Sequence, residues 1–134
     1  MSNRSVAESY FHAVTRGDLE GALATFAAGA EFIEPTGGVP YPDGVRAMLG
    51  GYISAFPGCR FEIKLAVESG TDVAIEGVWI GKNTGPMQLP DGNKMPATGK
   101  EVRAPFTTMF RIRDGKIVSH RAYWDMGGFM AQLA

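Results

Sequence analysis

The chain of 134 residues has too few thiol and imidazole groups for several classes of protein. Its single cysteine, Cys59, cannot form an internal disulfide, and we interpret it as a structural residue. Its two histidines, His12 and His120, lie far apart, and neither belongs to the i, i+4 pair that a helical metal site requires. We therefore expect no metal ion.

An excess of charge of one sign is also lacking, because 13 Lys and Arg residues stand against 14 Asp and Glu residues without a basic cluster. This balance argues against a nucleic-acid partner. No apolar run approaches the roughly 20 residues that cross a bilayer, and residues 1–5 lack the apolar segment of a signal peptide. The glycine pairs Gly37-Gly38 and Gly50-Gly51 lack the Lys-Ser/Thr of a phosphate-binding loop. We expect a cytoplasmic protein with no membrane partner and no nucleotide.

The first part of the chain carries helical periodicity within what its length indicates is a single domain, residues 1–134. Apolar residues recur at helical spacing over residues 6–14, with Ser5 as the expected N-cap and Glu8 completing a capping box. A second helix follows Asp18 and buries a stripe that ends at Phe26. A third helix is expected over residues 43–56.

The rest of the chain indicates β-structure. A short strand is expected over residues 31–34, and longer strands over residues 61–67, 73–80, 101–113 and 116–123. Residues 81–100, with three prolines and four glycines, predict an extended loop or irregular hairpin at the mouth of the fold. Helices followed by a four-to-six-stranded antiparallel meander indicate an α+β domain in which one curved sheet covers three helices. Its concave apolar interior suits a small hydrophobic ligand.

The final hairpin is the most informative local feature. Asp114-Gly115 predicts its turn, because Gly reaches positive φ without steric cost and Asp tolerates it. The second strand delivers Trp124 and then Asp125. A carboxyl placed against apolar groups is poorly solvated, holds its proton near neutral pH and can act as a general acid and base. The alternative is that Asp125 caps a terminal helix over residues 126–133.

Motifs from most of the chain form a recognisable series: Lys82-Asn83-Thr84-Gly85-Pro86, Leu89-Pro90-Asp91-Gly92, Pro96-Ala97-Thr98-Gly99-Lys100, the hairpin over residues 110–118 and Tyr123-Trp124-Asp125. Together they resemble the SnoaL-like polyketide (ester) cyclases, which belong to the nuclear transport factor 2-like superfamily of cone-shaped α+β domains. The resemblance implies an enzyme without a cofactor in which Asp125 is the general acid and base of an intramolecular aldol ring closure. Asn83 stands where this family often has histidine, and it can still donate a hydrogen bond to a carbonyl.

Two relatives in that superfamily supply alternative templates. The resemblance to ketosteroid isomerases matches Tyr10 to the tyrosine of the first helix and Glu34 to the carboxylate of the first strand, but Thr108 stands in place of their second acid. Limonene epoxide hydrolases need an Arg and an Asp where this chain has Phe106 and Thr108, which disfavours that chemistry. We predict a cyclase or isomerase acting on a small hydrophobic carbonyl compound, with a non-catalytic ligand-binding or dimerisation domain as the alternative.

Strand parity supplies further site candidates. Phe32 and Glu34 share one face of their strand, so Glu34 points inward if Phe32 belongs to the core. Thr108 is expected to face the interior. His120 shares a face with Trp124 and is a secondary catalytic candidate, although a lone histidine among apolar residues is more often a core side chain. The other expected pocket residues are Tyr10, Tyr52, Phe56, Trp79, Asn83 and Met87. The strand over residues 61–67 carries an apolar face, and we expect a homodimer.

Overall fold

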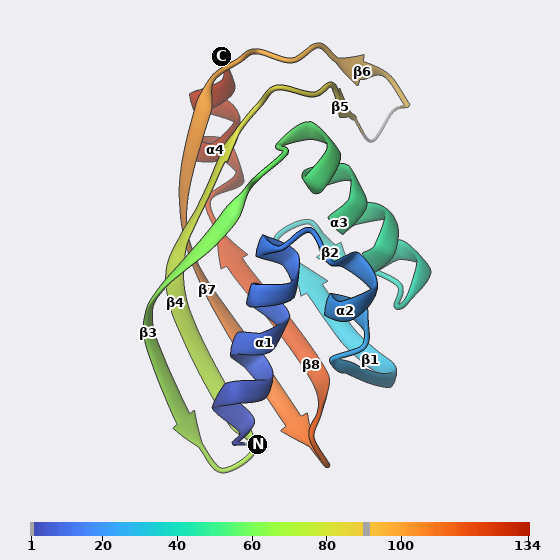
Figure 1. Ribbon diagram of the computed structural model, residues 1–134, viewed down its shortest axis with the longest axis vertical. Coiled ribbons are helices and arrows are strands. Elements are labelled where there is room, and N and C mark those ends of the chain that lie inside the picture. Colours follow the sequence, from blue (N-terminus) through green and yellow to red (C-terminus); the bar gives the residue numbers. More distant parts are fainter. Residues whose placement is uncertain (1, 90–91) are drawn as a thin grey trace.

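The computed structural model describes residues 2–89 and 92–134 and contains helices packed against a curved sheet (Figure 1). The helices are α1 (Asn3–Thr15), α2 (Leu19–Leu23), α3 (Asp43–Ala55) and α4 (Met126–Leu133). The sheet has the order β2-β1-β8-β7-β4-β3, with β1 (Phe26–Glu34), β2 (Gly37–Gly38), β3 (Arg60–Ser69), β4 (Asp72–Lys82), β7 (Glu101–Arg113) and β8 (Lys116–Trp124). The strands β5 (Met87–Gln88) and β6 (Lys94–Met95) form a separate pair. Pro90 and Asp91 of the predicted loop, and Met1, lie outside the described residues.

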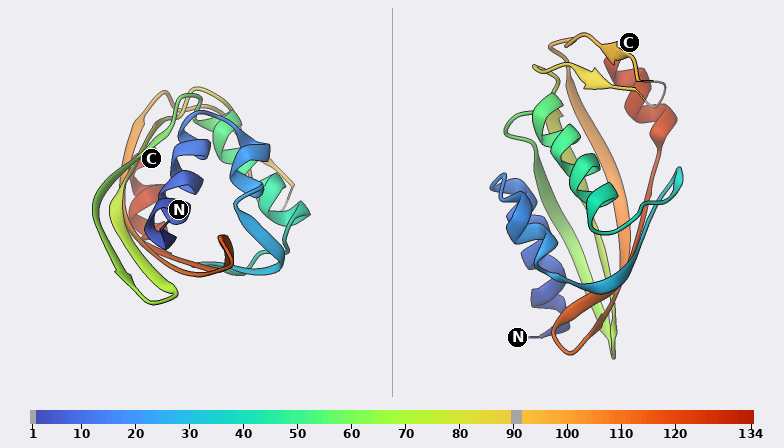
Figure 2. Two further views of the ribbon diagram at one scale, coloured as in Figure 1. Left: turned by 60° about the horizontal axis from the view of Figure 1, so that its bottom comes forward. Right: turned by 90° about the vertical axis from the view of Figure 1, so that its right-hand side faces the viewer.

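The sheet curls around α1 and α3, which lie on its concave face (Figure 2). Its strands converge toward the end where the N-terminus lies and spread at the other end, beside α3, α4 and the β5–β6 pair, so the domain tapers. The α+β architecture with a curved sheet is therefore as predicted. No helix among the described residues has both the length and the apolar character needed to cross a membrane.

One strand pair departs from the antiparallel meander predicted from the sequence. β3, β4, β7 and β8 pair antiparallel in turn, whereas β1 runs parallel to β8, with Phe32 opposite His120. Most of the chain separates β1 from β8, so no hairpin forces them to run in opposite directions. The turn at Asp114-Gly115 is confirmed, with φ of 51° and 75° at the two residues.

Two of the predicted helix boundaries are wrong. α1 begins at Asn3 because the Ser2 side chain accepts a hydrogen bond from the Ser5 amide, so the cap is Ser2 and not Ser5. The second helix ends at Leu23, and Phe26 belongs to the start of β1, where it lies opposite Ile117. Phe26 is still buried, and it reaches the core from a strand rather than from a helix.

A β-bulge in β3 divides its apolar residues between the two faces of the sheet. The pairing with β4 shifts between Ile63 and Leu65. Phe61 and Ile63 pack on the core, whereas Leu65 and Val67 are 54% and 51% exposed. Alternation alone places all four on one face, but an inserted residue reverses the parity of those that follow. The second half of β3 therefore presents Leu65 and Val67 on the outer face of the sheet.

Candidate active site

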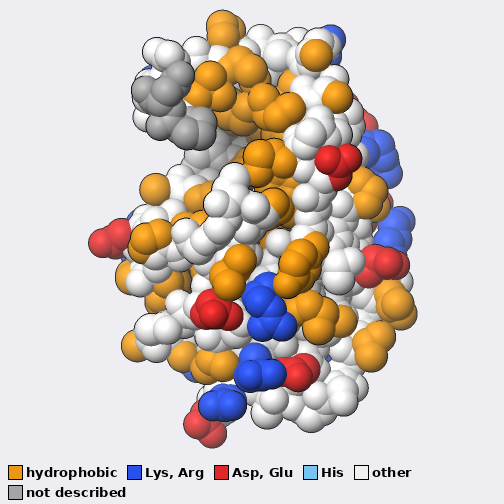
Figure 3. Space-filling view, turned by 180° about the vertical axis from the view of Figure 1, so that it is seen from behind, with side chains coloured by type: hydrophobic (Ala, Val, Ile, Leu, Met, Phe, Trp, Pro, Cys, Tyr) orange, Lys and Arg blue, Asp and Glu red, His pale blue; other side chains and the backbone are white. Residues whose placement is uncertain are grey.

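A cavity of about 90 Å³ opens between the concave face of the sheet and the helices α1, α3 and α4. It is smaller than the cavity of about 150 Å³ that holds benzene in an engineered apolar core, so it has room for at most one small ring. The space-filling view from behind shows a hollow with hydrophobic side chains along its wall (Figure 3). Most of the lining is apolar, and a few polar groups converge on it.

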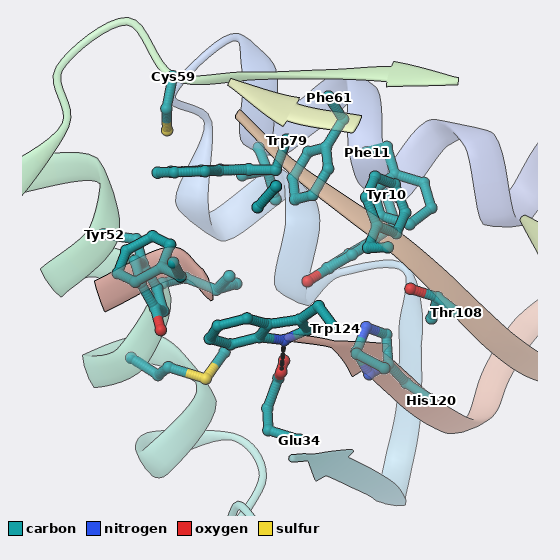
Figure 4. Close-up of a pocket in the computed structure, with 17 residues that line it drawn as sticks. Tyr10, Phe11, Glu34, Tyr52, Cys59, Phe61, Trp79, Thr108, His120 and Trp124 are labelled. Carbon is teal, nitrogen blue, oxygen red and sulfur yellow. Dashed lines mark hydrogen bonds between the residues drawn. The ribbon is translucent and has the colours of Figure 1, made fainter. Parts of the chain in front are cut away.

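The close-up of the cavity shows two chemically different ends (Figure 4). Tyr52 and Trp79 form an aromatic end together with Cys59, while Tyr10, Thr108 and His120 lie at the other end. Glu34 lies between them, beneath the indole of Trp124. The lining also includes apolar residues that the sequence analysis did not select for the site: Phe11, Val14, Leu49, Phe61, Ala104, Phe106, Ala122 and Phe129.

Glu34 is the carboxylate that faces the cavity among the described residues. It is the last residue of β1, and the indole Nε1 of Trp124 donates a hydrogen bond of 2.8 Å to its Oε2. Burial raises the pKa of Glu34 to about 6, and the Trp124 hydrogen bond offsets part of that rise. A carboxyl group with this pKa exchanges protons readily near neutral pH.

The two tyrosines of the cavity are hydrogen-bond donors rather than bases. Burial raises the pKa of Tyr52 to about 12 and that of Tyr10 further, and the charge of Glu34 adds to both shifts. Both phenols therefore keep their protons. The Tyr10 hydroxyl points into the cavity toward the Trp124 side (Figure 4).

His120 is a neutral, packed side chain. It is 2% exposed, and its ring stacks on Phe32 at 3.9 Å between centroids with a 9° interplanar angle. Burial lowers the pKa of His120 to about 3, so the imidazole is uncharged near neutral pH and has no proton to give as an imidazolium. Its Nδ1 has no hydrogen-bond partner among the described residues.

Asp125 lies outside the cavity and caps a helix. Its side chain accepts a hydrogen bond of 3.0 Å from the Gly128 amide at the start of α4, and the residue is exposed. The chain turns into α4 directly after Trp124, which carries Asp125 past the cavity wall. Of the two roles weighed from the sequence, the structure displays helix capping.

Three predicted pocket residues, Phe32, Phe56 and Met87, belong to the packed shell around the cavity. Asn83 is a bracing residue: its Nδ2 donates to the carbonyls of Ala55 and Gly85, and its Oδ1 accepts from the Thr98 amide and hydroxyl. These bonds tie the segment after β4 to the end of α3. The described residues contain no group of three or more His, Cys, Asp or Glu side chains that could hold a metal ion.

The family assignment follows from a match that covers most of the chain. The SnoaL-like domain family matches residues 7–120. The chain belongs to the SnoaL-like domain family. No curated protein matches this SnoaL-like protein.

Solved structures similar to this SnoaL-like protein share its cone-shaped, nuclear transport factor 2-like fold. A proposed polyketide cyclase from Xanthomonas campestris pv. campestris is 25% identical, with a TM-score of 0.80, over 99% of this chain and 100% of that one. IdmH, a proposed polyketide cyclase from Streptomyces antibioticus, is 24% identical, with a TM-score of 0.82, over 99% of each chain. AclR from Streptomyces galilaeus, a proposed hydroxylase, is 21% identical, with a TM-score of 0.82, over 98% of this chain and 94% of that one.

Proposed function

We propose that this SnoaL-like protein is a cofactor-independent acid/base catalyst of the cyclase type, acting on a small hydrophobic carbonyl compound. The observation that carries the proposal is the Glu34 carboxyl, which faces an apolar cavity with a pKa of about 6 and is held by Trp124. Groups with such a pKa are suited to taking and returning protons at physiological pH.

Glu34 starts the proposed reaction by removing a proton from the carbon next to a carbonyl. The C–H electron pair forms an enolate, and its oxygen accepts a hydrogen bond from the neutral Tyr10 hydroxyl. The enolate carbon then attacks a second carbonyl of the same molecule, which closes a ring and leaves an alkoxide. Glu34 returns its proton to that oxygen, so the enzyme ends as it began.

Two findings favour cyclisation, and one keeps an isomerase as the second candidate. The family match and the similar proposed cyclases favour ring closure. The positions of Tyr10 on α1 and Glu34 on β1 resemble the ketosteroid isomerase arrangement, in which the proton returns to a different carbon of the same enolate. A protein with the same fold is a proposed hydroxylase, which agrees with the general rule that a fold alone does not determine the reaction.

Proton exchange at carbon tests the step that both reactions share. We expect the protein to exchange the α-protons of cyclohexanone with solvent deuterium, measured by proton NMR. The rate is expected to rise as the pH passes through about 6, because Glu34 must be ionised to act as a base. A rate equal to that of the buffer, or a rate with no inflection near that pH, would contradict the proposal.

We also propose that the outer face of the sheet joins two copies of the chain. Leu65, Glu76, Thr107 and Tyr123 lie opposite one another in a row across β3, β4, β7 and β8. Leu65 and Tyr123 at its ends are 54% and 56% exposed. Hydrophobic side chains lie among charged ones on the face seen from behind (Figure 3).

Light scattering tests the pairing of two copies. The wild-type protein is expected to have the mass of a dimer, and Leu65→Lys/Val67→Lys that of a monomer, because two buried charges would lie in the interface. Met130→Lys changes an exposed apolar residue on α4 and is expected to remain dimeric. A monomeric wild-type protein would rule out the pairing.

A further inference from the structure

His120 is a buried polar group that the proposed proton transfer does not use. It lines the cavity, yet its Nδ1 has no hydrogen-bond partner among the described residues. Unpaired buried polar atoms are rare in folded proteins, because burial removes their bonds to water. A phenylalanine would fill the same space without burying an unpaired nitrogen. The imidazole therefore indicates a role beyond packing.

Packing fixes the orientation of this imidazole. One face stacks on Phe32, and the rings of Tyr10 and Phe110 meet it in edge contacts at 5.4 and 5.3 Å between centroids. β8 places His120 opposite Phe110 and places Ala122 opposite Thr108, which brings the imidazole and the Thr108 hydroxyl to the same end of the cavity (Figure 4). The imidazole is therefore held in place before any ligand arrives.

We infer that His120 determines specificity by binding an uncharged oxygen of the substrate, a carbonyl or a hydroxyl, at the end of the cavity that it shares with Thr108. The inference rests on the proposed function. In that reaction the reacting C–H bond of the substrate lies near Glu34 and the enolate oxygen accepts a hydrogen bond from Tyr10. His120 is assigned to the second oxygen of the same substrate. A ligand that uses the whole cavity places a ring against Tyr52 and Trp79 and its oxygen at His120.

The charges in the cavity exclude anionic ligands. The neutral imidazole and the Thr108 hydroxyl offer hydrogen bonds but no full positive charge, and the ionised Glu34 carboxylate repels an anion in the same apolar space. The favoured class is therefore an uncharged ring compound with a carbonyl or hydroxyl oxygen, rather than a carboxylic acid.

Three single-ring probes test the inference by calorimetric titration at about pH 7.5: acetophenone, ethylbenzene and benzoate. Acetophenone is expected to bind about tenfold more tightly than ethylbenzene, the value of one hydrogen bond, and benzoate more weakly than either. In His120→Phe, which keeps the stack on Phe32, the preference for acetophenone is expected to disappear while ethylbenzene still binds. His12→Phe changes the other, exposed histidine and is expected to keep the preference.

Nitrogen NMR of the wild-type protein gives a second readout that needs no variant. The chain has two histidines, so the ring signals are few, and acetophenone is expected to shift those of His120 and leave those of His12 in place. Equal affinity for acetophenone and ethylbenzene, a preference retained in His120→Phe, or unshifted His120 signals would overturn the inference. The binding assay is independent of turnover: failed α-proton exchange with a retained preference would refute the proposed reaction and support the binding role.

Discussion

Replacing Glu34 with glutamine is expected to lower the rate of α-proton exchange by about two to four powers of ten, whereas Asp125→Asn is expected to leave it nearly unchanged. Glutamine still offers Trp124 an oxygen to accept its indole hydrogen bond, so the cavity wall is preserved while the proton acceptor is lost. Asp125 lies outside the cavity, and asparagine is an equally good cap for α4.

The pair of variants separates the two carboxylates because both substitutions remove one charge and keep the side-chain shape. The measurement is the rate of α-proton exchange by NMR, at several pH values, for the wild-type protein and both variants. These rates identify which carboxylate is the base. If Asp125→Asn abolished exchange and Glu34→Gln retained it, Asp125 would be the base and Glu34 would not be the proton acceptor.

The free energy of unfolding is expected to depend on pH in opposite directions through Glu34 and His120. The pKa of Glu34 is raised from 4.5 to about 6, so its contribution is complete below about pH 4.5 and is lost, by about 2 kcal/mol, as the pH rises through 6. The pKa of His120 is lowered from 6.5 to about 3, so its contribution is present above about pH 6.5 and is lost as the pH falls toward 3.

Urea unfolding at about pH 7.5 and about pH 4 separates these two contributions. On acidification, protonation of His120 in the unfolded chain is expected to remove about 3 kcal/mol, and protonation of Glu34 in the folded protein to restore about 2 kcal/mol. The change in the free energy of unfolding between about pH 7.5 and about pH 4 is therefore expected to be about 3 kcal/mol more favourable in His120→Phe than in the wild-type protein. In Glu34→Gln the same change is expected to be about 2 kcal/mol less favourable than in the wild-type protein. Contributions common to the three proteins cancel when each variant is compared with the wild-type protein. If the free energy of unfolding had the same pH dependence in the wild-type protein and both variants, the raised pKa of Glu34 and the lowered pKa of His120 would both be contradicted.

Local patterns in the sequence predict much of the fold. The turn at Asp114-Gly115 follows from the tolerance of these two residues for positive φ, and both adopt it. Alternation on β7 places Thr108 inward, and the same parity would have found Phe106 and Ala104, which also line the cavity. Parity on β1 also brings Glu34 to the interior with Phe32.

Features set by distant or inserted residues could not be predicted in this way. Apolar alternation through β3 contains no signal for the bulge between Ile63 and Leu65, which reverses the faces that follow. Asp125 follows an aromatic strand and precedes a helix, so one residue satisfies the patterns of both a pocket carboxylate and a cap. The direction in which the chain leaves Trp124 decides between them, and tertiary packing sets that direction.

The hydrogen bond from Trp124 to Glu34 joins residues 90 positions apart, at the ends of β8 and β1, which run parallel. This separation has a consequence for the order in which the protein folds. The pairs β3–β4 and β7–β8 are hairpins, and β4 is separated from β7 by the short segment that holds β5 and β6, whereas β1 pairs with β8 only after a long loop has been closed. Until then Glu34 is an ordinary solvated carboxyl group. We therefore expect the capacity for proton transfer to arise late in assembly, so that a partly folded or growing chain carries no reactive base.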